Sequence, residues 1–177
     1  MNLANMITIL RMMLIPVFIM TVMYHKLNLA FVIFVIAAAT DGLDGYIARV
    51  RKERTQLGRI LDPVADKMLI ISAFVSFSLV SGLPGYLKMP VYVPIIIISR
   101  DVFILLGAVV IYLLTQNLEI KPSILGKITT FFQMLTVISL LLRFVYSCWI
   151  WNAAVVLTVI SGLDYLRIGA KQVNGKL

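Results

Sequence analysis

Residues 41–67 read DGLDGYIARVRKERTQLGRILDPVADK and separate two segments that are apolar enough to lie in a bilayer. Four of the eight acidic residues of the chain are the aspartates of this stretch, Asp41, Asp44, Asp62 and Asp66. On helices, the spacings of three and four residues put each pair of carboxylates on one face. Two facing helix ends would therefore bring four carboxylates to one point.

Four unpaired carboxylates repel one another and resist leaving water. On an insertion scale, a single charge at the centre of a membrane helix costs roughly 2.5–3.5 kcal/mol. Hard divalent cations remove that cost. Oxygen ligands favour Mg²⁺, Mn²⁺ or Ca²⁺ over zinc, and the stretch contains no histidine or cysteine that would suit a softer metal. The sequence therefore predicts a metal site on two helix ends.

Small residues and one arginine occupy fixed positions between the aspartates, namely Gly45, Ala48, Arg49 and Gly58. The whole pattern resembles the signature of the CDP-alcohol phosphotransferases, integral membrane enzymes that transfer a phosphoalcohol group from a CDP-linked donor to a second alcohol and release CMP. In the alternative interpretation the acids only pair with nearby basic residues. That alternative leaves the small residues unexplained.

The resemblance implies a role for each of these residues. It makes Asp41, Asp44 and Asp62 ligands of two Mg²⁺ or Mn²⁺ ions, and it makes Asp66 a further ligand and the general base. Small residues let a nucleotide approach a helix backbone closely. The predicted CDP-binding residues are Thr8, Asp41, Gly45, Ala48, Arg49 and Gly58.

The composition is that of a membrane protein. Of 177 residues, 61% are hydrophobic, and the mean hydropathy is +1.00. We therefore predict an all-α polytopic membrane protein with a single domain over residues 1–177. The net charge of +8 is better explained by the cytoplasmic membrane surface than by nucleic acid. Cys148 is the only cysteine, so an intramolecular disulfide is excluded.

Hydropathy and helix-breaking residues predict six membrane-spanning helices. The first starts at Asn2 or Asn5 and ends near residue 24, and the others cover residues 27–50, 61–80, 91–114, 123–144 and 152–166. Pro122 followed by Ser123 is typical of a helix start, and Trp149 and Trp151 suit the outer membrane interface. The aspartates then lie on a helical hairpin formed by the second and third spans.

The basic residues are unevenly distributed between the two predicted sides of the membrane. By the positive-inside rule, the side that carries most of them is cytoplasmic. We therefore expect both termini and the active site at the cytoplasmic face of the inner membrane. The inner residues are Arg49, Arg51, Lys52, Arg54, Arg59, Lys121, Lys127, Arg167, Lys171 and Lys176, and the outer residues are Lys26, Lys88 and Arg143.

Arg11, Arg100 and Asp101 are ionisable residues that fall inside predicted spans but outside the aspartate stretch. Arg11 needs a polar partner or a water-filled cavity, unless it only snorkels to the interface. Arg100 and Asp101 are neighbours, and adjacent helical residues differ by roughly 100° around the axis. We therefore expect Arg100 to face the substrate cavity and Asp101 to bond to another helix. A purely structural pair is the alternative.

A basic group inside a lipid enzyme suits an anionic acceptor, and the candidate acceptor-binding residues are Arg100, Lys121 and Lys127. Residues 5–11 (N-x-x-T-x-x-R), 126–130 and 161–165 resemble phosphatidylglycerophosphate synthases, which use CDP-diacylglycerol and glycerol 3-phosphate. Residues 98–101 and 121–122 also resemble cardiolipin synthases of the same superfamily, whose acceptor is phosphatidylglycerol. We predict the first activity and keep the second as the alternative.

Two other classes of protein explain the sequence less well. An ion transporter or channel also places acidic residues in membrane helices. However, these acids cluster at one face, and no matching pair of broken helices indicates an inverted repeat. A scaffold protein has no use for four converging carboxylates. The family resemblance also implies a homodimer.

Overall fold

The computed structural model describes the backbone of residues 3–50, 56–115 and 123–174, but not the side chains of residues 3–5, 41–50, 56–63, 108, 111–112, 114–115 and 170–174. The elements are α1 (Leu3–Met23), α2 (Leu27–Val50), α3 (Gln56–Leu79), η1 (Gly85–Leu87), α4 (Tyr92–Thr115), α5 (Ile124–Leu141) and α6 (Ser147–Asn174). Within the described residues, the predicted all-α class is confirmed.

Four segments of the described residues are long and apolar enough to cross a membrane. They are Met6–Met23, Gly85–Gly107, Ile124–Leu141 and Ser147–Gly169. The first part of α2 adds a shorter apolar stretch, Leu27–Thr40. A chain with this many apolar helices is a multi-pass membrane protein.

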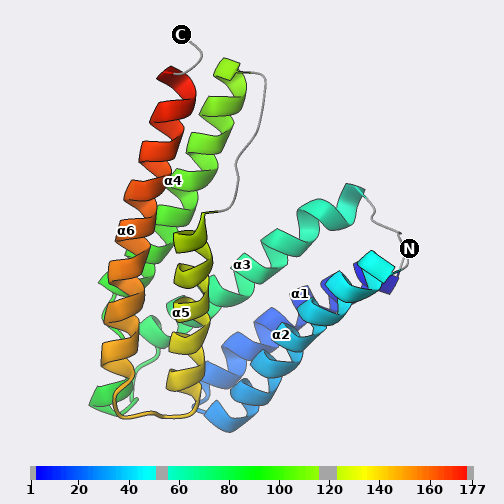
Figure 1. Cartoon of the computed structure of the whole chain (residues 1–177). Helices are drawn as coiled ribbons and strands as arrows, with labels where there is room; N and C mark the ends of the chain where they lie inside the picture. The colour runs from blue at the N-terminus through cyan, green and yellow to red at the C-terminus, as the bar shows by residue number, and fades with distance from the viewer. Residues whose placement is uncertain (1–2, 51–55, 116–122, 175–177) are drawn as a thin grey trace.

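The helices pack as two groups of three. In the amino-terminal half, α1 packs against both α2 and α3; in the carboxy-terminal half, α6 packs against both α4 and α5. Contacts between the halves are fewer and involve α2 and α3 on one side and α4 and α5 on the other. Figure 1 shows the two halves close together at the lower end and diverging toward the upper end.

The apolar core joins the halves at the lower end of Figure 1. Its buried residues come from the second halves of α1, α3 and α5, from the first halves of α2, α4 and α6, and from the connection that contains η1. They include Val22, Leu27, Phe77, Val93 and Leu140. Because all of these helix termini meet there, the ends that carry the aspartate stretch lie at the opposite, less tightly joined end.

One face of α1 is buried along its length and connects the core to that opposite end. Its members recur at helical spacing, from Val22, Phe18 and Ile15 in the core to Arg11 and Thr8 further along. The last two are fully buried although they are polar. A buried polar side chain requires hydrogen-bond partners, so this part of α1 faces a polar region.

Several predicted helix boundaries are wrong. The third helix starts at Gln56 instead of residue 61, and the sixth covers Ser147–Asn174 instead of residues 152–166. Hydropathy marks the segment that suits a bilayer, whereas backbone hydrogen bonds continue a helix through polar residues on either side. The fifth helix also ends earlier, at Leu141, but its start is confirmed, because the Ser123 side chain caps it by accepting a hydrogen bond from the backbone N–H of Gly126.

The two tryptophans differ from one another in their surroundings. Trp149 is exposed, as expected for a residue at a membrane interface, but Trp151 is 4% exposed and belongs to the core. The prediction that both lie at the interface is therefore wrong for Trp151. On a helix, residues two positions apart point in very different directions, so one faces outward while the other faces the bundle.

Candidate functional site

Arg11 of α1 forms an ion pair with Asp66 of α3. The Nη1 atom of Arg11 lies 2.5 Å from Oδ1 of Asp66, and the arginine side chain is fully buried whereas that of the aspartate is 40% exposed. The expectation of a polar partner for Arg11 is confirmed, and the snorkelling alternative is wrong because a snorkelling group reaches water. The pair fixes Asp66 on the side of α3 that faces α1.

The other predicted metal ligands and CDP-binding residues lie on the same helical hairpin. Asp41, Asp44, Gly45, Ala48 and Arg49 belong to the last turns of α2. Gly58 and Asp62 belong to the first turns of α3, which packs against α2. Their side chains lie outside the described residues, so the convergence of the carboxylates stays a prediction. The donor set is nevertheless one of carboxylate oxygens, which fits a hard divalent cation.

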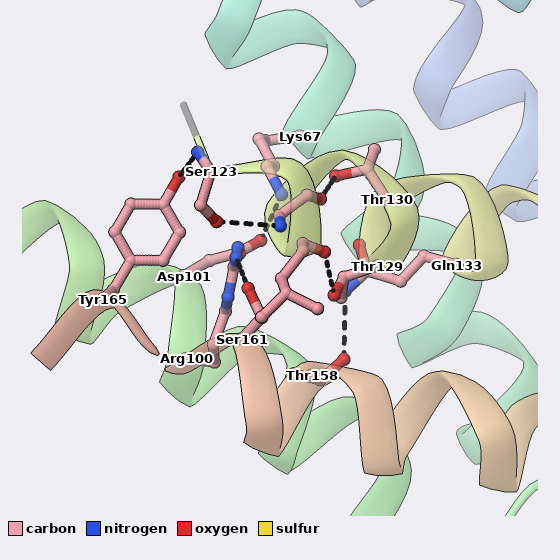
Figure 2. A network of polar contacts seen from close by, with 12 residues as sticks. Lys67, Arg100, Asp101, Ser123, Thr129, Thr130, Gln133, Thr158, Ser161 and Tyr165 are labelled. Atoms are coloured by element: carbon pink, nitrogen blue, oxygen red, sulfur yellow. Dashed lines mark hydrogen bonds and ion pairs between the residues drawn. The ribbon is translucent and has the colours of Figure 1, made fainter. Parts of the chain in front are cut away.

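A second polar cluster joins α3 to the carboxy-terminal half (Figure 2). The Nζ atom of Lys67 donates to Oδ2 of Asp101 at 2.7 Å, and Nη1 of Arg100 donates to Oδ1 of the same carboxylate at 2.8 Å. Asp101 therefore bonds to another helix, as expected. Arg100 and Asp101 also form the pair that was the alternative, because the long arginine side chain turns back to reach its neighbour. The role of Arg100 in a substrate cavity stays a prediction.

Arg100 makes further contacts with α6. Its Nη2 atom donates to Oγ of Ser161 at 2.6 Å, and its guanidinium carbon lies 5.3 Å from the centre of the Tyr165 ring. The latter distance is within the range of a cation–π interaction. Since only 10% of the side chain is exposed, the charge is held inside the bundle by one carboxylate, one hydroxyl and one aromatic face.

The start of α5 completes this cluster. The hydroxyl of Tyr165 accepts a hydrogen bond from the backbone N–H of Ser123 at 3.4 Å. Lys127, one of the predicted acceptor-binding residues, lies in the first turns of α5 and is exposed. Lys121 lies outside the described residues. Arg100 and the first turn of α5 are thus brought together.

Arg100 also borders an open groove between α4 and α6 of about 280 Å³. The lining is mostly apolar and includes Ile95, Phe103, Val159 and Leu163. This chemistry suits hydrocarbon better than a polar acceptor. The polar contacts of Arg100 are instead directed to Asp101 and Ser161.

Sequence reasoning assigned no role to Lys67. A signal was present, because a lysine inside a span is expected to pair with an acid in another helix. Asp101 was the candidate partner for Lys67, because it lies inside an apolar span. However, the pairing across 34 residues depends on how α3 and α4 are rotated. Ser161 and Tyr165 appeared only through the resemblance of residues 161–165.

Side chains of neighbouring elements approach Gly126 closely, so a larger residue at this position should be destabilising. A Cβ atom there would lie 3.2 Å from the Tyr165 hydroxyl, 3.3 Å from Oγ of Ser123 and 3.4 Å from Nη2 of Arg100. Gly126→Leu should therefore destabilise the protein by about 1–3 kcal/mol through overpacking, measured as a lower Tm in detergent.

Gly107→Ala is the matched control, since a Cβ atom on Gly107 would meet no atom within 4 Å. Alanine also has the higher helix propensity, by about 1 kcal/mol in water, so the control should keep or raise the Tm. An unchanged Tm in Gly126→Leu would contradict the tight contact with Arg100 and Tyr165.

Comparisons with known proteins agree with the aspartate signature. Residues 1–160 match the family model of CDP-alcohol phosphatidyltransferase. A probable phosphatidylglycerophosphate synthase of Mycobacterium tuberculosis is 33% identical over 98% of this chain and 84% of its own length. A CDP-diacylglycerol--glycerol-3-phosphate 3-phosphatidyltransferase of Bacillus subtilis is 32% identical over 93% of both chains.

Similarity also extends to a cardiolipin synthase, the alternative predicted from residues 98–101 and 121–122. The human cardiolipin synthase (CMP-forming) is 30% identical over 96% of this chain, but over only 62% of its own length. Because the family model covers most of the chain and includes the whole aspartate stretch, the chain belongs to the CDP-alcohol phosphatidyltransferase family.

Proposed function

We propose that the protein transfers the phosphatidyl group of CDP-diacylglycerol to glycerol 3-phosphate, giving phosphatidylglycerophosphate and CMP. The observation that carries this choice is the similarity, over nearly the whole chain, to bacterial proteins whose names specify this reaction. A buried arginine beside the start of α5 further supports an anionic acceptor.

In our proposal, the amino-terminal half binds the metal and the donor, and the carboxy-terminal half binds the acceptor. Asp41, Asp44 and Asp62 hold Mg²⁺ or Mn²⁺ in our proposal, which when bound neutralises charge on the diphosphate and on the leaving phosphate. Asp66, ion-paired with Arg11, accepts the proton of the attacking hydroxyl. Gly45 and Ala48 leave room for the nucleotide. Arg100, Lys121 and Lys127 attract the phosphate of the acceptor.

The proposed topology has six spans, with both termini and the active site at the cytoplasmic face. Supporting it, the start of α1, the α2–α3 hairpin and the ends of α4 and α6 lie at the upper ends of the two halves in Figure 1. The hairpin and the carboxy-terminal end are also the basic parts of the sequence. We further propose one domain over residues 1–177 and a homodimer, which cross-linking in native membranes will test.

The activity is tested with purified protein and CDP-diacylglycerol. With glycerol 3-phosphate and Mg²⁺ or Mn²⁺, we expect phosphatidylglycerophosphate and an equal amount of CMP. Cardiolipin formed from phosphatidylglycerol, with glycerol 3-phosphate inert, would instead support the cardiolipin synthase alternative. Release of CMP in the absence of both acceptors, or no reaction with either acceptor, would contradict both activities.

Lys127→Ala should raise the KM for glycerol 3-phosphate more than the KM for CDP-diacylglycerol. The reason is that Lys127 is exposed in the first turn of α5, directly after Gly126, which lies close to Arg100, on the half that lacks the four signature aspartates. Loss of one charge-assisted hydrogen bond corresponds to about 1.5–3 kcal/mol, or roughly 10-fold to 100-fold. Lys88→Ala, at the opposite end of the molecule, should leave both constants unchanged. Equal effects on the two substrates would remove Lys127 from the acceptor site.

Gly45→Leu and Ala48→Leu should weaken binding of the CDP donor, because each adds a side chain where the nucleotide approaches α2. Ala39→Leu adds the same side chain to an exposed position of that helix and serves as the control. Donor affinity is measured on purified protein with a non-reactive CDP analogue. Affinity equal to that of Ala39→Leu would contradict the close approach.

A further inference from the structure

The amino-terminal and carboxy-terminal halves are joined mainly at one end of the molecule. The shared apolar core lies where the helices turn around at the lower end of Figure 1, and the helices diverge beyond it. In the proposed function, α2 and α3 carry the metal and donor residues, while α4 and α5 carry the acceptor residues. The distance between donor and acceptor therefore depends on how the diverging parts are held.

Lys67 and Asp101 form the ion pair that crosses between the halves in the described part of the chain. Lys67 is on α3 and Asp101 on α4, and both side chains are partly shielded, with exposures of 37% and 14%. Arg11 with Asp66 joins helices of the amino-terminal half, and Arg100 with Ser161 joins helices of the carboxy-terminal half. The crossing pair thus connects two polar clusters.

Asp66 and Lys67 are consecutive residues of α3 and are held from different directions. Asp66 is held by α1 and Lys67 by α4. Consecutive side chains point about 100° apart around a helix. Together the two ion pairs therefore restrict both the rotation of α3 and its distance from α4.

Asp101 uses both of its carboxylate oxygens in this arrangement. Oδ2 accepts from Lys67 and Oδ1 accepts from Arg100. The same carboxylate therefore sets the position of the proposed base through Lys67 and the position of the acceptor arginine through Arg100. Loss of a partner from a shielded charge pair is costly, because the remaining charges lose their compensation.

We infer that Asp101 is a positioning residue, which sets the separation between the donor half and the acceptor half through its bond to Lys67. This inference rests on the proposed function for the roles of the two halves, but not for the geometric link. Asp101 itself contacts neither donor nor metal in this scheme. Its removal should change turnover and geometry without changing donor binding.

The kinetic test is a double-mutant cycle with Lys67→Met and Asp101→Asn. Because the two residues act through one bond, each single variant should lower kcat by about tenfold or more, and the double variant should be no slower than Asp101→Asn. The affinity for a non-reactive CDP analogue should stay within a few-fold of the wild type. Asp101→Glu, which keeps the charge, should recover part of the lost turnover.

The geometric test needs no activity. Spin labels at Met6→Cys on α1 and Leu113→Cys on α4, both exposed positions, report the distance between the diverging ends in a Cys148→Ser background. Labelled chains are diluted with unlabelled ones so that distances within one chain dominate. Asp101→Asn should lengthen or broaden this distance, and labels at Tyr24→Cys and Trp149→Cys, at the joined end, should show no change.

Two outcomes would overturn the inference. One is an unchanged Met6–Leu113 distance in both Asp101→Asn and Lys67→Met, and the other is a double variant whose loss of kcat is the product of the single losses. If Asp101→Asn does not fold, Lys67→Met still breaks the crossing pair while Arg100 keeps its carboxylate. If glycerol 3-phosphate proves inert in the wild type, the proposed function fails, and the distance test still decides the inference.

Discussion

Asp41→Asn, Asp44→Asn and Asp62→Asn should each reduce turnover by about a thousandfold or more. The physical reason is that each removes a charged oxygen ligand from the proposed metal site, and a bound divalent ion supplies several kcal/mol of charge stabilisation in the transition state. At 1.36 kcal/mol per tenfold change in rate, about 4 kcal/mol corresponds to roughly a thousandfold. CMP release is measured from purified protein.

The matched control is Glu53→Gln, which removes a carboxylate from the same stretch of sequence but outside the aspartate signature. It should retain nearly full activity. The three aspartate variants should also insert and purify like the wild type, since the apolar segments are unchanged, and titration with Mg²⁺ or Mn²⁺ should show weaker metal binding. Substantial turnover at saturating metal would remove that carboxylate from the mechanism.

Asp66→Asn should lower kcat by about 10²-fold to 10⁴-fold, the usual contribution of a general base, while donor affinity changes little. The geometry of Asp66 suits this role, because Arg11 holds it against α1 while its side chain is 40% exposed. The measurement is a comparison of kcat with the dissociation constants for metal and CDP analogue.

The role of Asp66 as a metal ligand predicts a different result from the same variant. If metal and donor affinity fall as far as in Asp62→Asn, Asp66 is mainly a ligand. Because the substitution also removes one charge from the ion pair with the buried Arg11, a loss of stability is expected, and the Tm must be measured in parallel. Asp66→Glu, which keeps the charge at a greater reach, should retain more stability than Asp66→Asn.

Much of the fold could be predicted from the order of residues alone. Apolar runs of sufficient length fixed the class and the approximate helices, and the Pro122-Ser123 pair correctly located the start of α5. The aspartate stretch indicated both the helical hairpin and the family. These features depend on local hydrogen bonding, on hydropathy and on spacing along one chain segment, and each of these can be read without knowing how helices pack.

The partners of the buried charges were decided only by the tertiary structure. Arg11 pairs with Asp66 across 55 positions, Lys67 with Asp101 across 34 and Arg100 with Ser161 across 61. The sequence indicated that such charges need partners, but the choice depends on the rotation and separation of packed helices. The same rotation buries Trp151 while Trp149 stays exposed. Helical periodicity gives the relative directions of side chains on one helix, whereas the neighbour that each one meets is set by packing.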